Sequence, residues 1–229
     1  MGRLMKDEMA QMLGDIRQEV RLTKDWIGRD HLDERVMSAM KKVPRHEFVP
    51  SECRYFAYAN GPLAIGQGQT ISQPYIVALM SDLLETDAGD VVLEVGTGSG
   101  YQAAVLSQLV KQVYSLEIIA PLAHAAAERL RRLGYDNVEV RAGDGYHGWA
   151  EHAPFDGIIV TAAAPCIPPP LIEQLKPGGR LVAPVGTAYG HQVLTVAEKD
   201  KHGTIAMHEV LPVAFVPLTG RHESENDAG

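Results

Sequence analysis

The chain has 229 residues, of which 45% are hydrophobic and 22% are charged. This length suits one α/β domain, and the composition is that of an ordinary globular protein rather than a disordered or fibrous one. Acidic residues outnumber basic ones, 29 to 21, which gives a formal net charge of -8. A negative charge of this size repels a phosphate backbone, so nucleic acid is not expected as a partner.

Cysteine and histidine usage gives no sign of a metal or redox site. Cys53 and Cys166 stand far apart, so both are expected to be reduced and inert. The nine histidines show no metal-ligand spacing such as an H-E-x-x-H pair. The first 20 residues lack the pattern of an export signal, and no apolar run approaches the roughly 20 residues of a membrane helix. We therefore expect a cytoplasmic protein that binds no metal and no membrane.

The first part of the chain predicts helices separated by a loop. Apolar residues recur at three- and four-residue steps over residues 5–20, and again over residues 31–42. Residues 55–69 are rich in glycine and aromatic residues and are expected to form a loop, after which a third helix is expected from Pro74 to Leu84. Whether the first helix covers its own domain or a partner stays open, and so does the oligomeric state.

From residue 91 onward, short apolar runs alternate with helical stretches. Strands are expected at residues 91–95, 112–116, 138–141, 157–160 and 180–182, and helices at 101–110, 121–133 and 171–175. Two further strand-like runs, 192–197 and 205–210, flank a turn and predict an antiparallel hairpin.

This alternation is typical of βαβ units around a parallel sheet. The predicted fold class is therefore α/β and Rossmann-like, with a mostly parallel sheet flanked by helices and a C-terminal antiparallel hairpin. We expect a single domain over residues 1–229, in which residues 1–70 form a helical and loop extension. The polar tail at residues 221–229 is expected to be frayed.

The strongest chemical signal is a glycine turn directly after the first predicted strand, with the sequence Leu93-Glu94-Val95-Gly96-Thr97-Gly98-Ser99-Gly100. Glycines in such a turn let the backbone approach a ligand that a Cβ would exclude. A dinucleotide fingerprint, G-x-G-x-x-G, would need its third small residue at position 101, where this chain has Tyr101. The spacing, together with the acidic Glu94, favours a ligand that carries an ammonium and a sulfonium over a pyrophosphate.

Two more acidic residues follow the next two predicted strands. Glu117 ends the second strand, where a carboxylate can accept hydrogen bonds from both hydroxyls of a ribose. Asp144, followed by Gly145, comes after the third strand and could read the edge of an adenine. S-adenosylmethionine and NAD both carry these groups. The alternative is that Glu94, Glu117 and Asp144 only cap turns or helices.

A nine-residue element ahead of the glycine turn, Gly66-Gln67-Gly68-Gln69-Thr70-Ile71-Ser72-Gln73-Pro74, makes the chain resemble the protein-L-isoaspartate O-methyltransferase family. Further stretches similar to that family lie at residues 43–50, 94–104, 155–164, 174–186 and 215–219. The resemblance spans roughly residues 30 to 220, so it covers most of the chain.

The resemblance implies a class I methyltransferase that transfers a methyl group from S-adenosylmethionine to the α-carboxylate of L-isoaspartyl residues in damaged proteins and peptides. The products would be S-adenosylhomocysteine and a methyl ester that starts repair through a succinimide. Ser72 matches the family's catalytic serine. The family's cofactor contacts fall on Thr70, Ser72, Glu94, Gly96, Thr97, Gly98, Gly100, Glu117, Asp144, Gly145 and Thr219.

A carboxylate acceptor simplifies the chemistry. A carboxylic acid with a pKa of about 4 is already ionised at neutral pH, so no general base is required, and the sequence offers no obvious catalytic dyad. We expect a dual role for Ser72, whose hydroxyl orients one carboxylate oxygen and which, with Thr70, stands where the N-cap of the following helix belongs. The alternative is that Thr70 and Ser72 serve only as this cap.

Small residues at two further strand ends are expected to line a groove for an extended substrate peptide. They are Ala162, Ala163, Pro184 and Val185. The alternative is that they only allow close packing of helices on the sheet. Two other functions stay open: a methyltransferase of the same fold acting on a small molecule or RNA, and a module that binds S-adenosylmethionine or NAD without catalysis.

Overall fold

The computed structural model describes residues 3–220, so the predicted polar tail lies outside the described residues. A seven-stranded sheet has the order β5-β4-β3-β6-β7-β8-β9. Its strands are β3 (Val91–Val95), β4 (Gln112–Glu117), β5 (Val138–Ala142), β6 (Phe155–Val160), β7 (Leu175–Gly186), β8 (Gln192–Lys199) and β9 (Ile205–Val213). Strands β3 to β7 pair in parallel, whereas β7 with β8 and β8 with β9 pair antiparallel. The predicted fold class is confirmed.

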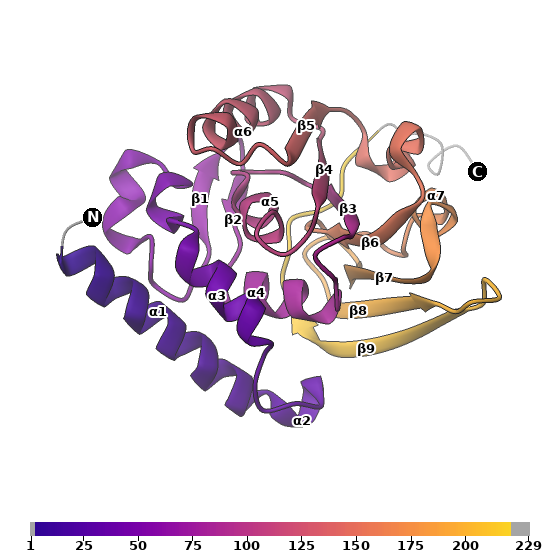
Figure 1. Cartoon of the computed structure of the whole chain (residues 1–229), viewed down its shortest axis with the longest axis horizontal. Coiled ribbons are helices and arrows are strands. Elements are labelled where there is room, and N and C mark those ends of the chain that lie inside the picture. Colours follow the sequence, from indigo (N-terminus) through magenta and orange to yellow (C-terminus); the bar gives the residue numbers. More distant parts are fainter. Residues whose placement is uncertain (1–2, 221–229) are drawn as a thin grey trace.

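Helices cover the sheet and form most of the N-terminal part (Figure 1). The α-helices are α1 (Arg3–Leu22), α2 (Lys24–Ile27), α3 (Glu34–Lys42), α4 (Pro74–Leu83), α5 (Tyr101–Leu106), α6 (Ala120–Arg132) and α7 (Pro169–Glu173). Short 3-10 helices are η1 (Arg45–Glu47), η2 (Ser51–Phe56), η3 (Gly145–His147) and η4 (Ala150–His152). The predicted helices and strands are therefore present, with ends that shift by a few residues.

The prediction of a loop over residues 55–69 is wrong. Strands β1 (Leu63–Gly66) and β2 (Gln69–Ile71) form a separate antiparallel hairpin there. Its turn has positive φ at Gln67 (53°) and Gly68 (72°), the backbone twist that suits a two-residue hairpin turn. The glycines that suggested a loop are thus the turn residues of two strands too short to show an alternating pattern.

Helix α1 packs on its own domain, which answers the question that the sequence left open. It lies along the outer edge of the molecule and contacts α3 and α4 (Figure 1). Met12 and Ile16 have no exposed surface, and they belong to one hydrophobic cluster with residues of α4, α5 and the sheet.

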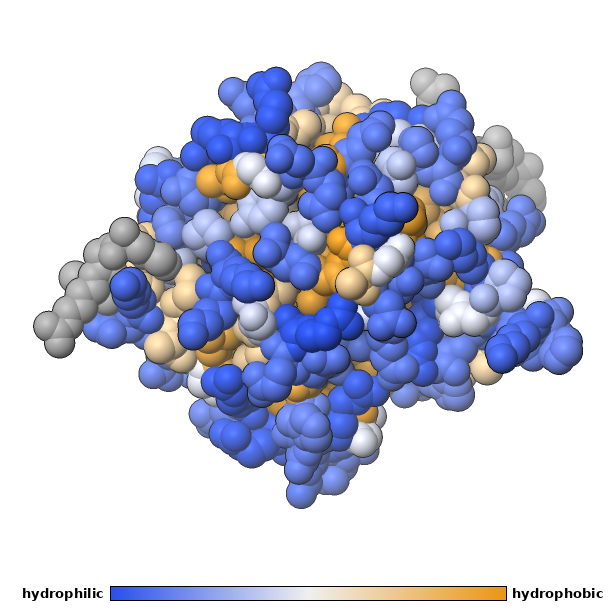
Figure 2. Space-filling model, viewed as in Figure 1, coloured by the Kyte–Doolittle hydropathy of each residue, from blue (hydrophilic) through white to orange (hydrophobic). Residues whose placement is uncertain are grey.

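The surface around these elements is mostly hydrophilic. On the face drawn in Figure 2, apolar residues appear in small separate areas among polar ones, as is usual for a globular protein. Over residues 3–220, no helix combines the length and the apolar character needed to cross a membrane.

The direction of winding changes between β3 and β6. From β3 the chain proceeds outward to β4 and β5, then returns to β6 on the other side of β3. In open α/β sheets, ligands bind in the crevice that this change opens beyond the carboxyl ends of the strands. The crevice here lies between the glycine turn after Val95 and the residues after Val160.

Because α1 is held by its buried apolar face, Ile16→Ala should destabilise the protein. We expect the free energy of unfolding to fall by about 3 kcal/mol, since a large side chain is removed from a packed core. Urea unfolding followed by circular dichroism measures this. Gln18→Ala, on the exposed face of the same helix, is the control and should change stability by less than about 0.5 kcal/mol. Equal effects of the two changes would contradict the packing of α1.

Candidate active site

The glycine turn closes tightly against the end of β6. Gly96 has a φ of 97°, and a Cβ on it would lie 2.3 Å from Thr161 Oγ1. The Thr161 hydroxyl donates to the carbonyl of Gly96 at 2.6 Å. A residue with a side chain could not occupy position 96 without separating the two strand ends. The turn therefore presents bare backbone at the crevice.

Glu117 ties the end of β4 to this turn. Its Oε2 accepts a hydrogen bond from the backbone N–H of Gly98 at 2.8 Å, and its Oε1 accepts from the N–H of Ile119 at 3.0 Å. Each carboxylate oxygen keeps a second lone pair, and the residue lines the adjoining cavity. Glu117 therefore caps a turn and also presents a carboxylate to a ligand, so the two interpretations of this acid are compatible.

A first cavity, called here the glycine-loop cavity, lies over this turn. Its lining residues are Gln69, Thr70, Val95, Gly96, Gly98, Leu116, Glu117, Ile118, Ile119, Gly145, Thr161, Ala162, Val216, Pro217, Leu218 and Thr219. Among the residues that the structure describes, this lining contains one carboxylate and no Lys, Arg or His. A pyrophosphate would lie there without a cationic partner, whereas a ligand with a ribose and positive charge finds a matching acceptor. The residues present thus fit S-adenosylmethionine.

A second cavity, called here the Ser72 cavity, adjoins the first and has a volume of about 480 Å³. Its lining residues are Pro62, Thr70, Ser72, Gln73, Ile76, Thr161, Pro212, Val213, Ala214, Phe215 and Val216. Thr70, Thr161 and Val216 line both cavities, so the two meet at these residues. A group bound in one cavity can therefore reach a group bound in the other.

The Ser72 hydroxyl is available for a ligand. Helix α4 starts at Pro74, and its N-cap is Gln73, which makes no capping bond through its side chain. Thr70 lies in β2, so the expected helix cap at Thr70 and Ser72 is wrong, both as part of a dual role and as the alternative. Within residues 3–220, the half-buried Ser72 makes a hydrogen bond only through its carbonyl, which accepts from Arg45.

Glu94 does not reach either cavity. It is fully buried in β3, where one carboxylate oxygen accepts from the Ser115 hydroxyl and the other, Oε1, has no partner among the described residues. Burial away from water raises the pKa of Glu94 to about 8, and the nearby Glu117 acts in the same direction. Glu94 is therefore neutral at pH 7 and supplies no charge to a ligand. It bonds Ser115, which in turn bonds Thr97 of the glycine turn.

Of the other predicted donor-site residues, some line the glycine-loop cavity and others lie behind it. Gly145 and Thr219 line the glycine-loop cavity. Asp144 precedes η3, where its side chain accepts from the Tyr146 N–H at 3.0 Å. Thr97 and Gly100 are buried behind the turn: the Thr97 hydroxyl bonds Ser115 Oγ at 2.5 Å, and Gly100 is the N-cap of α5.

Most of the predicted peptide-groove residues lie outside both cavities. Ala162 lines the glycine-loop cavity, but Ala163, Pro184 and Val185 line neither. The Ala163 N–H donates to Val216 at 2.8 Å, and its carbonyl accepts from Leu218 at 2.7 Å. The chain's own residues therefore occupy the hydrogen-bonding edge that a peptide would need at Ala163.

The sequence did not indicate Thr161 or residues 212–216, at the end of β9 and directly after it. Thr161 follows β6 at the point where the winding changes, and its place after an apolar strand was an available signal. Pro212, Val213, Ala214, Phe215 and Val216 line the Ser72 cavity. The Phe215 N–H donates to the buried Gln192 side chain at 2.6 Å, a long-range contact without any local sequence pattern.

Metal ligands are not part of this arrangement. Over residues 3–220, no three His, Cys, Asp or Glu side chains are placed so that they could hold a metal ion.

The fold and the site define a class I methyltransferase, with a doubly wound sheet and a glycine turn at its crevice. Comparison with known proteins agrees. A family model for protein-L-isoaspartate(D-aspartate) O-methyltransferase matches residues 22–223. The chain belongs to the protein-L-isoaspartate(D-aspartate) O-methyltransferase family.

Individual relatives match over most of their length. A protein-L-isoaspartate O-methyltransferase 2 of Syntrophobacter fumaroxidans is 62% identical over 93% of this chain and 86% of its own length. One from Nitrosococcus oceani is also 62% identical, over 93% of this chain and 97% of its own. A solved structure from Plasmodium falciparum, described as a family member in complex with S-adenosyl-L-homocysteine, superposes with a TM-score of 0.74 at 26% identity, covering 91% of this chain and 97% of that one.

The burial of Glu94 predicts a pH dependence of stability. The pKa of Glu94 is raised to about 8 in the folded protein from 4.5, so between these values folding takes up a proton that unfolding releases. The stability that protonated Glu94 contributes to the folded protein is fully present below pH 4.5 and is lost as the pH rises to 8. Glu94→Gln should therefore gain stability relative to the unchanged protein by up to about 1.4 kcal/mol per pH unit across this window. Urea unfolding at pH 5, 6.5 and 8 tests this, and parallel profiles would contradict it.

Proposed function

We propose that the two adjoining cavities divide one reaction between them, with the methyl donor in the glycine-loop cavity and the substrate carboxylate in the Ser72 cavity. The chain is an enzyme of its family and transfers a methyl group from S-adenosylmethionine to L-isoaspartyl residues of proteins. The observation that carries the assignment of residues is that the cavities meet at Thr70, Thr161 and Val216.

The donor half rests on few side chains. Glu117 accepts from the ribose hydroxyls, while the backbone of Gly96 and Gly98 allows close approach of the ligand. Gly145 lines the cavity and, with Asp144 directly before it, takes the adenine edge, while Thr219 lines the same cavity. When bound, S-adenosylmethionine supplies a methyl group on a sulfonium that leaves as a neutral thioether. Glu94, Thr97 and Gly100 act through the shape of the turn.

In the acceptor half, Ser72 orients the substrate. Its free hydroxyl donates a hydrogen bond to one oxygen of the isoaspartyl α-carboxylate, which leaves the second oxygen facing the neighbouring cavity. Apolar residues Ile76, Val213 and Phe215 line the same cavity and limit water. Water stabilises the separate charges of carboxylate and sulfonium more than it stabilises the transition state, in which the charges cancel, so a dry site favours transfer.

No proton has to be moved in this step. The carboxylate is ionised at neutral pH and attacks without a base, so position and orientation supply the catalysis. In the resulting methyl ester, methanol leaves far more readily than an oxygen leaves the free carboxylate. The neighbouring backbone amide nitrogen can then attack the ester carbonyl, expel methanol and close a succinimide, which water reopens in part to a normal aspartyl bond.

We also retain two broader proposals. One is a single domain over residues 1–229 with residues 1–70 as an extension, which is supported by the continuous hydrophobic cluster from Met9 to Leu211. The other is a cytoplasmic location, which is supported by the free thiols of Cys53 and Cys166.

Transfer of radiolabelled methyl groups tests the activity directly. An isoaspartyl peptide should accept label and its normal aspartyl twin should not, because only the former presents an α-carboxylate on the side branch. Absence of label in both peptides would contradict the enzyme assignment. Equal label would contradict the specificity for isoaspartate.

Ser72→Ala tests the role of the hydroxyl. Loss of one hydrogen bond to a charged group should lower kcat/KM for the isoaspartyl peptide by about 10- to 100-fold. The melting temperature should stay within about 2 °C, since the hydroxyl caps no helix. Ser51→Ala, an exposed serine in η2, is the matched control and should leave kcat/KM unchanged. Unchanged turnover in Ser72→Ala would exclude the proposed role.

A further inference from the structure

Arg45 lies in the stretch at residues 43–50 that the sequence singled out but that has no role in the site described above. Its side chain has no exposed surface. Within residues 3–220 it forms no ion pair with any Asp or Glu, and its Nη1 has no hydrogen-bond partner. Burial lowers the pKa of Arg45, but a guanidinium starts from so high a value that it stays protonated. A positive charge without a counter-charge is therefore held inside the protein.

The guanidinium donates to backbone carbonyls from three segments. Nε donates to Ala57 at 2.8 Å, and Nη2 donates to Ser72 at 2.8 Å and to Gly61 at 3.4 Å. These carbonyls belong to the end of η2, the approach to β1 and the turn before α4. The fixed planar fork of arginine suits a fan of acceptors at set angles, so Arg45 defines the position of the Ser72 backbone.

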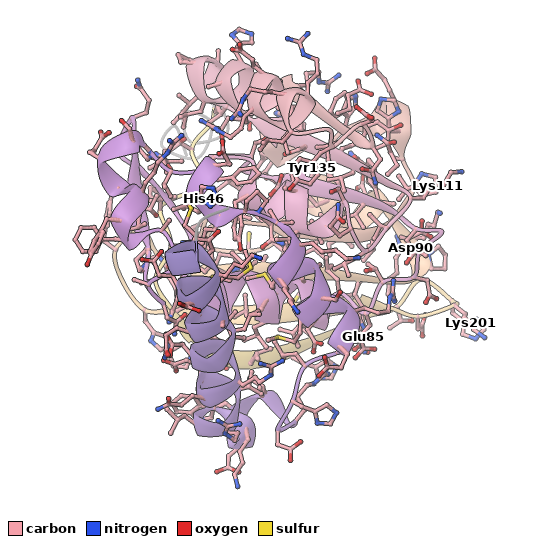
Figure 3. All side chains as sticks on the ribbon, turned by 60° about the vertical axis from the view of Figure 1, so that its left-hand side comes forward. His46, Glu85, Asp90, Lys111, Tyr135 and Lys201 are labelled. Carbon is pink, nitrogen blue, oxygen red and sulfur yellow. The ribbon has the colours of Figure 1, made fainter. Side chains whose placement is uncertain are left out.

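The same guanidinium also contacts the helix that follows the glycine turn. Its Cζ lies 4.8 Å from the centre of the Tyr101 ring, in a cation–π arrangement. Tyr101 is the first residue of α5 and directly follows Gly100, the last residue of the glycine turn. Phe48 packs against Tyr101 and Tyr135, and His46 packs against Tyr58. Figure 3 labels His46 and Tyr135, which come from the N-terminal part of the chain and from the segment after α6.

We infer that Arg45 is a positioning residue for methyl transfer, which fixes Ser72 relative to the glycine turn and supplies a buried positive charge that favours an anionic acceptor at Ser72. This inference rests on the proposed function of Ser72. In-line transfer requires the two reactants to be aligned, and Arg45 couples the Ser72 backbone to the helix that begins directly after the glycine turn.

The lack of an Asp or Glu partner for Arg45 within residues 3–220 argues that the residue does more than support the fold. Three carbonyls could be held by neutral amide donors at a smaller cost, because an unpaired buried charge is expensive. The unpaired positive charge of Arg45 is therefore available to attract an anionic ligand. The isoaspartyl carboxylate is the anion that the proposed function brings to the adjoining Ser72 cavity.

Steady-state kinetics with Arg45→Gln and Arg45→Lys test the inference. Arg45→Gln removes the charge and should raise KM for the isoaspartyl peptide by about tenfold or more, with KM for S-adenosylmethionine within about twofold. Arg45→Lys keeps the charge but not the fork, so its peptide KM should lie between those of Arg45→Gln and the unchanged protein. Leu171→Ala, a fully buried residue of α7 on the other cluster, is the control for lost stability.

The outcomes are distinguishable. If Arg45 only supports the fold, Arg45→Gln should behave like Leu171→Ala, with less active enzyme but an unchanged peptide KM, and the inference is overturned. It is also overturned if neither Arg45 variant folds, because the residue then serves folding rather than the position of Ser72. Failure of the unchanged protein to methylate the isoaspartyl peptide would instead overturn the proposed function, on which the inference depends.

Discussion

Gly96 lies against Thr161 where the sheet changes its winding direction, and the missing side chain lets the two strand ends meet. With any other residue, a Cβ would lie 2.3 Å from Thr161 Oγ1. The hydroxyl that fills this place holds the Gly96 carbonyl, and Thr161 itself lines both cavities. A wider separation would move the glycine turn away from Thr70 and open the boundary between the donor and acceptor sides. In the proposed function, the close approach of Gly96 to Thr161 therefore sets the distance between the methyl donor and the acceptor.

The parts of the site that follow from local sequence were predictable. Glu117 at the end of a strand and the glycines of a sharp turn could be recognised from the sequence. Strand ends and positive φ are local properties that residue type indicates. The α/β fold followed in the same way from alternating apolar periods. Ser72 entered through resemblance, and its structure changed the interpretation, because Gln73 takes the capping position that sequence spacing had assigned to Thr70 and Ser72.

The parts that sequence could not give depend on distant contacts. Glu94 looked like a ligand for a cation, but its orientation in β3 turns it to Ser115 and away from the cavity. The segment at residues 212–216 lines the Ser72 cavity because Gln192, about 20 residues earlier, holds the backbone of Phe215. The strand ends at Ala163 and Pro184 are occupied by pairing with Val216, Leu218 and Ala164. None of these pairings leaves a periodic pattern in the chain.

Charge is distributed so that each side of the crevice suits its reactant. On the proposed donor side the buried Glu94 is neutral at pH 7, so within residues 3–220 Glu117 is the one carboxylate that lines the cavity. On the acceptor side the N-terminal segment contributes Arg45, a buried cation bonded to the carbonyl of Ser72. The glycine-loop cavity is lined both by strand ends of the sheet and by Gln69 and Thr70 of the β1–β2 hairpin. In the proposed function, Arg45 adds the charge that favours an anionic acceptor at Ser72. An enzyme that needs no base depends on this arrangement for its rate, because alignment and electrostatic complementarity are the means left to it.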